Sequence, residues 1–140
     1  MAFTGNFSCN SFRSGLVNGS FNFSTDSFRL ALYTNAATLD QTTAAYTDVG
    51  EATGGNYAAT GLPVTATVST DTTASGSITY ISFSSPVWTG AITARGALIY
   101  KAGANGAVCV LDFGSNKTST NTFTVTMPAN TSTSALIRLS

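Results

Sequence analysis

The chain has 140 residues, no histidine, and only 9% charged residues, six basic and six acidic, which gives a net charge of zero. Ordinary soluble domains carry about 25% charged residues. Because histidine is the commonest general base and metal ligand near neutral pH, its absence removes the usual part of most hydrolase, nuclease and transition-metal mechanisms. The basic residues are scattered, whereas nucleic-acid binding needs a clustered positive patch. The composition favours a packed structural protein that joins surfaces over an enzyme.

The length corresponds to a single domain that covers residues 1–140. No apolar run approaches the roughly 20 residues of a membrane-spanning helix, so we expect no membrane contact. Residues 1–6 lack the basic and then apolar organisation of a signal peptide, so we expect a protein made in the cytoplasm.

Helix is scarce, and the best candidate is residues 10–17. Asn10 is suited to cap this helix, and Phe12 and Leu16 are spaced to share one face, although Gly15 weakens it. A second short turn is expected to begin near Asp40.

The next strong signal is an alternating strand at 28–34, followed by a long polar loop at 35–56. Long loops of this kind are commonly functional or disordered. Three apolar side chains could pin this loop to the rest of the protein, namely Leu39, Tyr46 and Val49.

The second half of the chain predicts a series of strands with polar turns between them. The segment 76–83 is apolar on both faces, which is typical of a central or bulged strand. Asn105 and Gly106 lie in a short connection between apolar runs, which is a strong hairpin signal. The remaining predicted strands are 97–100, 107–113, 122–127 and 135–139. In the last two, the inward residues are expected to be Phe123, Val125 and Met127, and then Ala135, Ile137 and Leu139.

Many short strands, glycine-rich turns and almost no helix predict an all-β fold. We expect a β-sandwich of jelly-roll or immunoglobulin-like type, with at most one or two short helices.

Two cysteines, Cys9 and Cys109, lie far apart in the chain, and the sequence leaves open whether they pair. Two buried free thiols are the favoured interpretation, because free cysteine behaves as a small hydrophobic residue. A zinc site would need two further ligands, and no histidine or CxxC motif supplies them. The sequence therefore predicts no cofactor and no metal site.

The carboxylates offer little chemistry. Asp40, Asp48 and Glu51 share one loop, but they lack the spacing of a calcium loop, so solvated charges are the favoured interpretation. Asp112 lies in an apolar strand, where a carboxylate needs a partner, and Arg95 is the natural candidate. A buried pair of this kind is more often structural than catalytic. No catalytic residues are predicted.

Aromatic residues are the candidates for an interface. The N-terminal phenylalanines make residues 1–20 a possible arm that docks on a neighbour, since aromatic residues are enriched in interface cores. Burial in the chain's own core is the commoner fate, and it is also favoured for the single tryptophan. The candidate interface residues are Phe3, Phe7, Phe12 and Trp88.

Framework segments of the chain resemble a family of small virion structural proteins of tailed bacteriophages. The resemblance covers most of the chain and contains no catalytic motif. Its segments are 28–34, 37–40, 44–47, 87–89, 92–100, 110–115 and 117–120.

This resemblance implies a non-enzymatic role, most simply a capsid decoration (cement) protein on the capsid exterior, made in the host cytoplasm. Its expected partners are the major capsid protein and further copies of itself, for example a trimer at local threefold positions. No nucleic-acid partner is expected. The alternative is a tail, baseplate or fibre component, including a receptor-binding module. Such a module would carry a clustered, exposed aromatic or carboxylate site that involves Trp88 or the loop 35–56.

Overall fold

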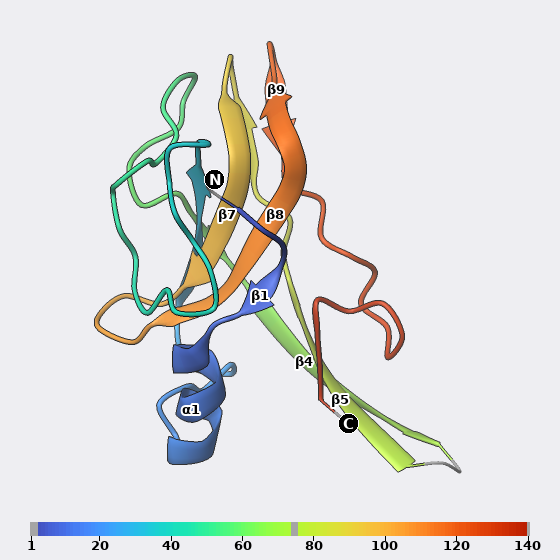
Figure 1. Cartoon of the computed structure of the whole chain (residues 1–140). Helices are drawn as coiled ribbons and strands as arrows, with labels where there is room; N and C mark the ends of the chain where they lie inside the picture. The colour runs from blue at the N-terminus through green and yellow to red at the C-terminus, as the bar shows by residue number, and fades with distance from the viewer. Residues whose placement is uncertain (1–2, 74–75, 140) are drawn as a thin grey trace.

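The computed structural model describes residues 3–73 and 76–139, and this part of the chain is mostly β-structure with one short helix (Figure 1). In chain order the elements are β1 (Phe7–Ser8), α1 (Asn10–Asn18), β2 (Phe28–Tyr33), β3 (Leu62–Val64), β4 (Ala66–Thr73), β5 (Gly76–Phe83), β6 (Val87–Thr89), β7 (Thr93–Tyr100), β8 (Ala107–Thr118), β9 (Thr122–Thr124) and β10 (Ile137–Leu139).

The described strands form three antiparallel sheets. The largest has five strands in the order β1-β8-β7-β2-β3, the second has the order β10-β5-β4, and the third pairs β6 with β9. The structure is mostly β with one short helix, which agrees with the expectation of strands and at most one or two short helices. Of the two interpretations of 76–83, the central one is correct, because β5 lies between β10 and β4.

The β7–β8 hairpin forms where the sequence predicted it. Leu98 pairs with Val110 and Ile99 with Cys109 across the ladder. The turn between the strands closes with a 2.8 Å hydrogen bond from the Lys101 amide to the Gly106 carbonyl. Asn105 has φ of +59°, a left-handed conformation that asparagine tolerates better than most residues.

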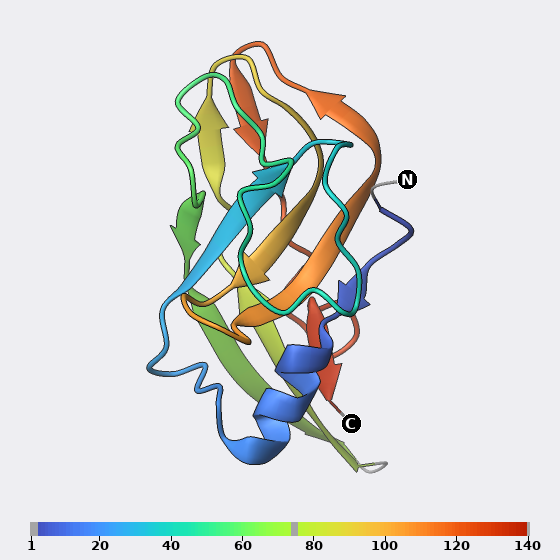
Figure 2. The same cartoon turned by 60° about the vertical axis from the view of Figure 1, so that its left-hand side comes forward.

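The central part of the five-stranded sheet, in β2, β7 and the start of β8, is buried on both faces. Alternate residues of its central strands belong to two separate apolar clusters, so that Leu30 and Leu32 face one cluster and Ala31 and Tyr33 the other. The larger cluster includes residues of the two smaller sheets and of α1. The smaller cluster includes residues of the N-terminal segment and of the loop after β2. Figures 1 and 2 show this loop lying over the sheet.

Helix α1 forms at the predicted place but differs at its start. Cys9, not Asn10, is the N-cap, and no side chain caps the helix. Gly15 was expected to weaken the helix, but it makes room for the ring of Phe21. An added Cβ at this position would overlap that ring. Phe12 packs edge-on against the same ring, with the centroids 5.8 Å apart. Of the expected arm 1–20, Phe3, Phe12 and Gly15 are buried in their own chain, and residues 1–2 lie outside the described part.

The segment after Asp40 is a turn, as expected, and a hydrogen bond from the Thr43 amide to the Asp40 carbonyl closes it. Other expected details differ. Of the three side chains expected to pin the loop, Leu39 is buried and Tyr46 half-buried, whereas Val49 is 66% exposed because it lies in a surface turn.

The last two strands are shorter than expected. The first ends at Thr124, because its partner β6 has only three residues, although Val125 is still buried and Met127 is partly buried. The second covers only Ile137–Leu139, with Ala135 and Ile137 buried as predicted. The inward placement of Leu139 was wrong, because this residue is 42% exposed on an edge strand.

The turn that leads into β3 depends on Gly61. This residue has φ of +76°, and an added Cβ would overlap the carbonyl oxygen of Leu30. Gly19 has a similar φ of +80° with open space around it. Gly61→Ala should therefore cost clearly more stability than Gly19→Ala, which bears only the backbone strain of about 1–2 kcal/mol. Equilibrium urea unfolding measures both, and equal losses would contradict this account of Gly61.

Candidate functional site

The four aromatic interface candidates lie mostly inside the protein. Phe3, Phe12 and Trp88 are 1–2% exposed, and Phe7 is half-buried. Trp88 packs against Tyr57, with ring centroids 5.5 Å apart. Phe3, Phe12 and Trp88 are therefore core residues in this structure, and their side chains do not form a surface patch.

The two cysteines are buried free thiols, as the favoured interpretation predicted. Burial raises the pKa of Cys9 to about 12, with a further contribution from the charge of Asp40. Burial also raises the pKa of Cys109. Both thiols are therefore protonated at neutral pH and act as small apolar side chains.

The predicted pair of Arg95 and Asp112 is confirmed as an ion pair across the β7–β8 ladder. The Arg95 guanidinium also lies 5.6 Å from the centroid of the Phe3 ring. The Asp112 amide donates a 2.6 Å hydrogen bond to the Asn6 side chain. The pair therefore holds the N-terminal segment on the sheet, which is a structural role.

The loop carboxylates have separate structural contacts. Asp40 accepts hydrogen bonds from the Thr42 amide at 2.7 Å and the Thr42 hydroxyl at 2.6 Å. Within residues 3–73 and 76–139, no group of three or more His, Cys, Asp or Glu side chains is placed to hold a metal ion. In the same residues no helix is both long and apolar enough to cross a membrane.

Glu51 is the centre of a polar network that the sequence did not reveal. Its carboxylate accepts hydrogen bonds from the hydroxyls of Tyr46 (2.5 Å) and Tyr57 (2.6 Å) and from the amide of Thr60 (2.8 Å). The Tyr57 hydroxyl in turn accepts a 2.9 Å bond from the Leu32 amide. One carboxylate thus joins the long loop, the following turn and the central strand β2.

A pocket of about 470 Å³ lies beside this network. It is formed by the start of β2, the end of β7 and the loops next to them, and a volume of this size is typical of a small-molecule site. Its lining residues are Arg29, Ala45, Tyr46, Thr60, Tyr100, Ala102 and Gly103.

The tyrosines around Glu51 are held in their neutral form. Burial and the hydrogen bond to Glu51 raise the pKa of Tyr46 to about 12. Burial is also the largest cause of the raised pKa values of Tyr33, Tyr57 and Tyr100. At neutral pH these hydroxyls are hydrogen-bond donors.

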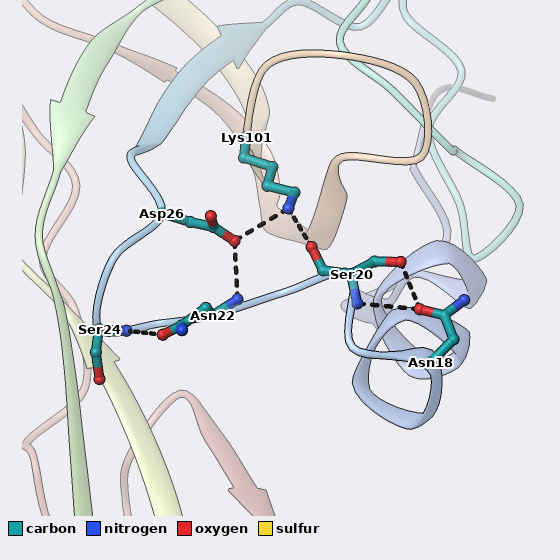
Figure 3. Close-up of polar contacts among 6 residues, drawn as sticks. All are labelled: Asn18, Ser20, Asn22, Ser24, Asp26 and Lys101. Atoms are coloured by element: carbon teal, nitrogen blue, oxygen red, sulfur yellow. Dashed lines mark hydrogen bonds and ion pairs between the residues drawn. The ribbon is translucent and has the colours of Figure 1, made fainter.

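Lys101 anchors the turn that carries one wall of the pocket (Figure 3). Its Nζ lies 3.0 Å from Asp26 Oδ2, donates a hydrogen bond to the Ser20 carbonyl, and sits 4.8 Å from the centroid of the Phe21 ring. Asp26 also accepts a 2.8 Å bond from the Asn22 amide, and the Asn22 amide together with Lys101 lowers the pKa of Asp26. The turn is therefore tied to the segment between α1 and β2.

Comparison with known proteins adds no relative. No protein-family model matches the chain, and no significant match was found among the curated proteins or the solved structures compared with it.

The Glu51 network gives a first prediction for this region. Glu51→Gln puts an amide donor where three donors converge, so we expect a loss of about 1–3 kcal/mol in the free energy of unfolding. Asp48→Asn is the control, because this exposed side chain in the same loop makes no hydrogen bond to the described residues, and its effect should stay within about 0.5 kcal/mol. Urea unfolding measures the free energy of unfolding of both variants, and equal losses would contradict the role of Glu51.

The tyrosine pKa values predict sensitivity to alkali. Between about pH 10 and about pH 12 the unfolded chain has lost the Tyr46 proton while the folded chain keeps it, so the unfolding free energy falls as pH rises. Tyr46→Phe has no such proton and should show a shallower decline. Unfolding measured at a series of alkaline pH values tests this, and an unchanged slope in the variant would contradict it.

Proposed function

We propose that the protein is a non-enzymatic virion structural protein that decorates the exterior of a bacteriophage capsid and stabilises the shell. The support from sequence is the resemblance to phage virion proteins together with the absence of histidine. The segments that carry the resemblance overlap the framework strands β2, β7 and β8, so the likeness concerns the fold and its surfaces.

We also propose that the sheets are arranged as a β-sandwich. The larger apolar cluster supports this, because residues of β2, β7 and β8 share it with residues of β5, β6 and β9. Packing of this kind places the two smaller sheets over one face of the five-stranded sheet.

The observation that carries the proposal is the β4–β5 ribbon, which extends away from the body of the protein (Figures 1 and 2). Its ladder is unbroken from Ala66↔Phe83 to Thr73↔Gly76, whereas β10 supports only Thr79–Ile81. Most of β4 is solvent-exposed. A bare two-stranded ribbon is at best marginally stable in water, so its outer part gains most from a partner.

The outer edge of β4 is suited to contact with another protein. Along residues 66–72 no strand of the described chain pairs with this edge. Soluble proteins usually protect such an edge with lysine, proline or a bulge. Here the only charged side chain is Asp71, and the strand has no lysine, proline or register shift.

The partners in this proposal are the major capsid protein and further copies of the chain. A protein that bridges capsid subunits stabilises the assembled shell by mass action, since it binds the assembled state and not the separate subunits. A trimer at local threefold positions would place three ribbons on neighbouring capsid subunits.

The experiment is binding to expanded capsids that lack this protein. We expect saturable binding with a fixed copy number and a higher temperature of shell disruption. Absence of binding to heads, with co-purification on tails, would overturn the capsid role.

The ribbon is tested with a matched pair of exposed valines. Val68 on β4 is 46% exposed and Val17 on α1 is 90% exposed. Val68→Lys adds the charge that disfavours edge contacts, so it should weaken capsid binding by at least about tenfold, whereas Val17→Lys should leave it unchanged. Equal binding of both variants would show that β4 is not the docking edge.

The alternative, a tail, baseplate or fibre component with receptor-binding ability, keeps one supporting observation. Tyr46, from the loop 35–56, lines the pocket together with Tyr100. Tyr46 is a partly exposed aromatic side chain of this loop, whereas Tyr100 and Trp88 are almost fully buried.

A further inference from the structure

Arg29 lies in the pocket with its positive charge uncompensated. The side chain is half-buried, and among the described residues no carboxylate forms an ion pair with it. By contrast, Arg95 and Lys101 have Asp112 and Asp26 as partners. A partly desolvated guanidinium without a counter-ion favours an anion more strongly than an exposed one.

The guanidinium is held in a fixed orientation. Its Nη2 donates to the Gly61 carbonyl at 2.7 Å, and its Nε donates to the Thr60 carbonyl at 3.3 Å. Arg29 also forms a side-chain hydrogen bond with the Tyr100 hydroxyl. A guanidinium has five N–H groups, so those not used in these contacts are available to a ligand, at little cost in side-chain entropy.

The backbone next to Arg29 is strained at Thr60. This residue has φ of +79°, which is uncommon for a β-branched side chain. Its carbonyl also accepts a 2.7 Å bond from the Tyr100 hydroxyl, and its amide donates to Glu51. Strained residues held by several hydrogen bonds cluster at binding sites. Here the strained residue uses its carbonyl to hold both Arg29 and Tyr100 in place at the pocket.

The rest of the lining suits a ring of moderate polarity. Tyr46 is half-buried and stacks on Tyr100, which is 3% exposed, with the ring centroids 5.1 Å apart. The small residues Ala45, Ala102 and Gly103 also line the pocket. Aromatic side chains combine apolar contact area with a polar tip, which suits the C–H faces and hydroxyl groups of a pyranose. An inorganic anion would use Arg29 but not the aromatic wall.

We propose that this pocket binds the carboxylate-bearing ring of an acidic sugar, such as a hexuronate unit of a surface polysaccharide. Arg29 pairs with the carboxylate, and the half-buried Tyr46 ring, which stacks on Tyr100, packs against the sugar ring. The site goes beyond capsid decoration and does not depend on the position of the protein in a virion.

The test is a titration of the isolated protein with glucuronate, glucose, acetate and inorganic phosphate, followed by NMR chemical shifts and calorimetry. We expect saturable binding of glucuronate, at least about tenfold tighter than that of glucose, because Arg29 interacts only with the charged sugar. Acetate and phosphate should not compete in the same concentration range. Equal affinity for glucose, equal affinity for phosphate, or no saturable binding of glucuronate would each overturn the proposal.

A pair of variants locates the site. Ala102 is exposed and lines the pocket, whereas Ala104 is exposed on the same turn and does not line it. Ala102→Trp should fill the pocket and abolish glucuronate binding, and Ala104→Trp should leave binding unchanged.

Arg29→Lys completes the test, because it keeps the charge but loses the planar fork, and it should weaken binding by about tenfold with the fold checked by circular dichroism. Retained binding in both Ala102→Trp and Arg29→Lys would place the sugar elsewhere and overturn the assignment.

Discussion

Strands β2 and β7 and the first part of β8 are buried on both faces, so this part of the sheet needs a cover on each side. The smaller sheets supply strands to the apolar cluster on one face. On the other face the cover is the N-terminal segment and the loop after β2, which contribute Phe3, Ala37 and Leu39. A loop with few large apolar side chains gains little from burial, so it must be fixed by other interactions.

Polar contacts fix this loop. The Tyr33 hydroxyl donates to the Thr47 carbonyl at 2.7 Å, and Glu51 joins the loop to the turn before β3. A partly buried carboxylate is tolerated because three donors satisfy it. The same bonds stiffen the backbone at Thr60, whose carbonyl orients Arg29 and Tyr100. The pocket is therefore built by the residues that cover the sheet.

Local signals predicted much of the framework. The alternation in β2, the turn Asn105-Gly106 and the two-sided apolar pattern of β5 depend on neighbours in sequence, and each element formed where expected. The pair of Arg95 and Asp112 could also be predicted, because a lone charge in an apolar strand needs a partner.

The pocket and its network could not be predicted in the same way. Arg29 binds the carbonyls of Thr60 and Gly61 more than 30 residues away, and polar loop residues carry no periodicity that would reveal such contacts. The contact between Gly15 and Phe21 could not be predicted for a related reason. A glycine inside a helix lowers helix stability, and the sequence does not show that the Phe21 ring occupies the space beside it.

The distribution of charge connects the two outward-facing features. Two ion pairs within the chain use Arg95 with Asp112 and Lys101 with Asp26. Strand β4 has a single charged side chain, Asp71. A free protein at zero net charge with an unprotected edge strand is prone to associate through that edge. The edge is therefore safest when a neighbouring subunit covers it, as in an assembly. The pocket that contains Arg29 shares no lining residue with β4. In the two proposals the charge that would bind a ligand lies on β2 and the edge that would contact a capsid subunit lies on β4, so the same residues do not serve both partners.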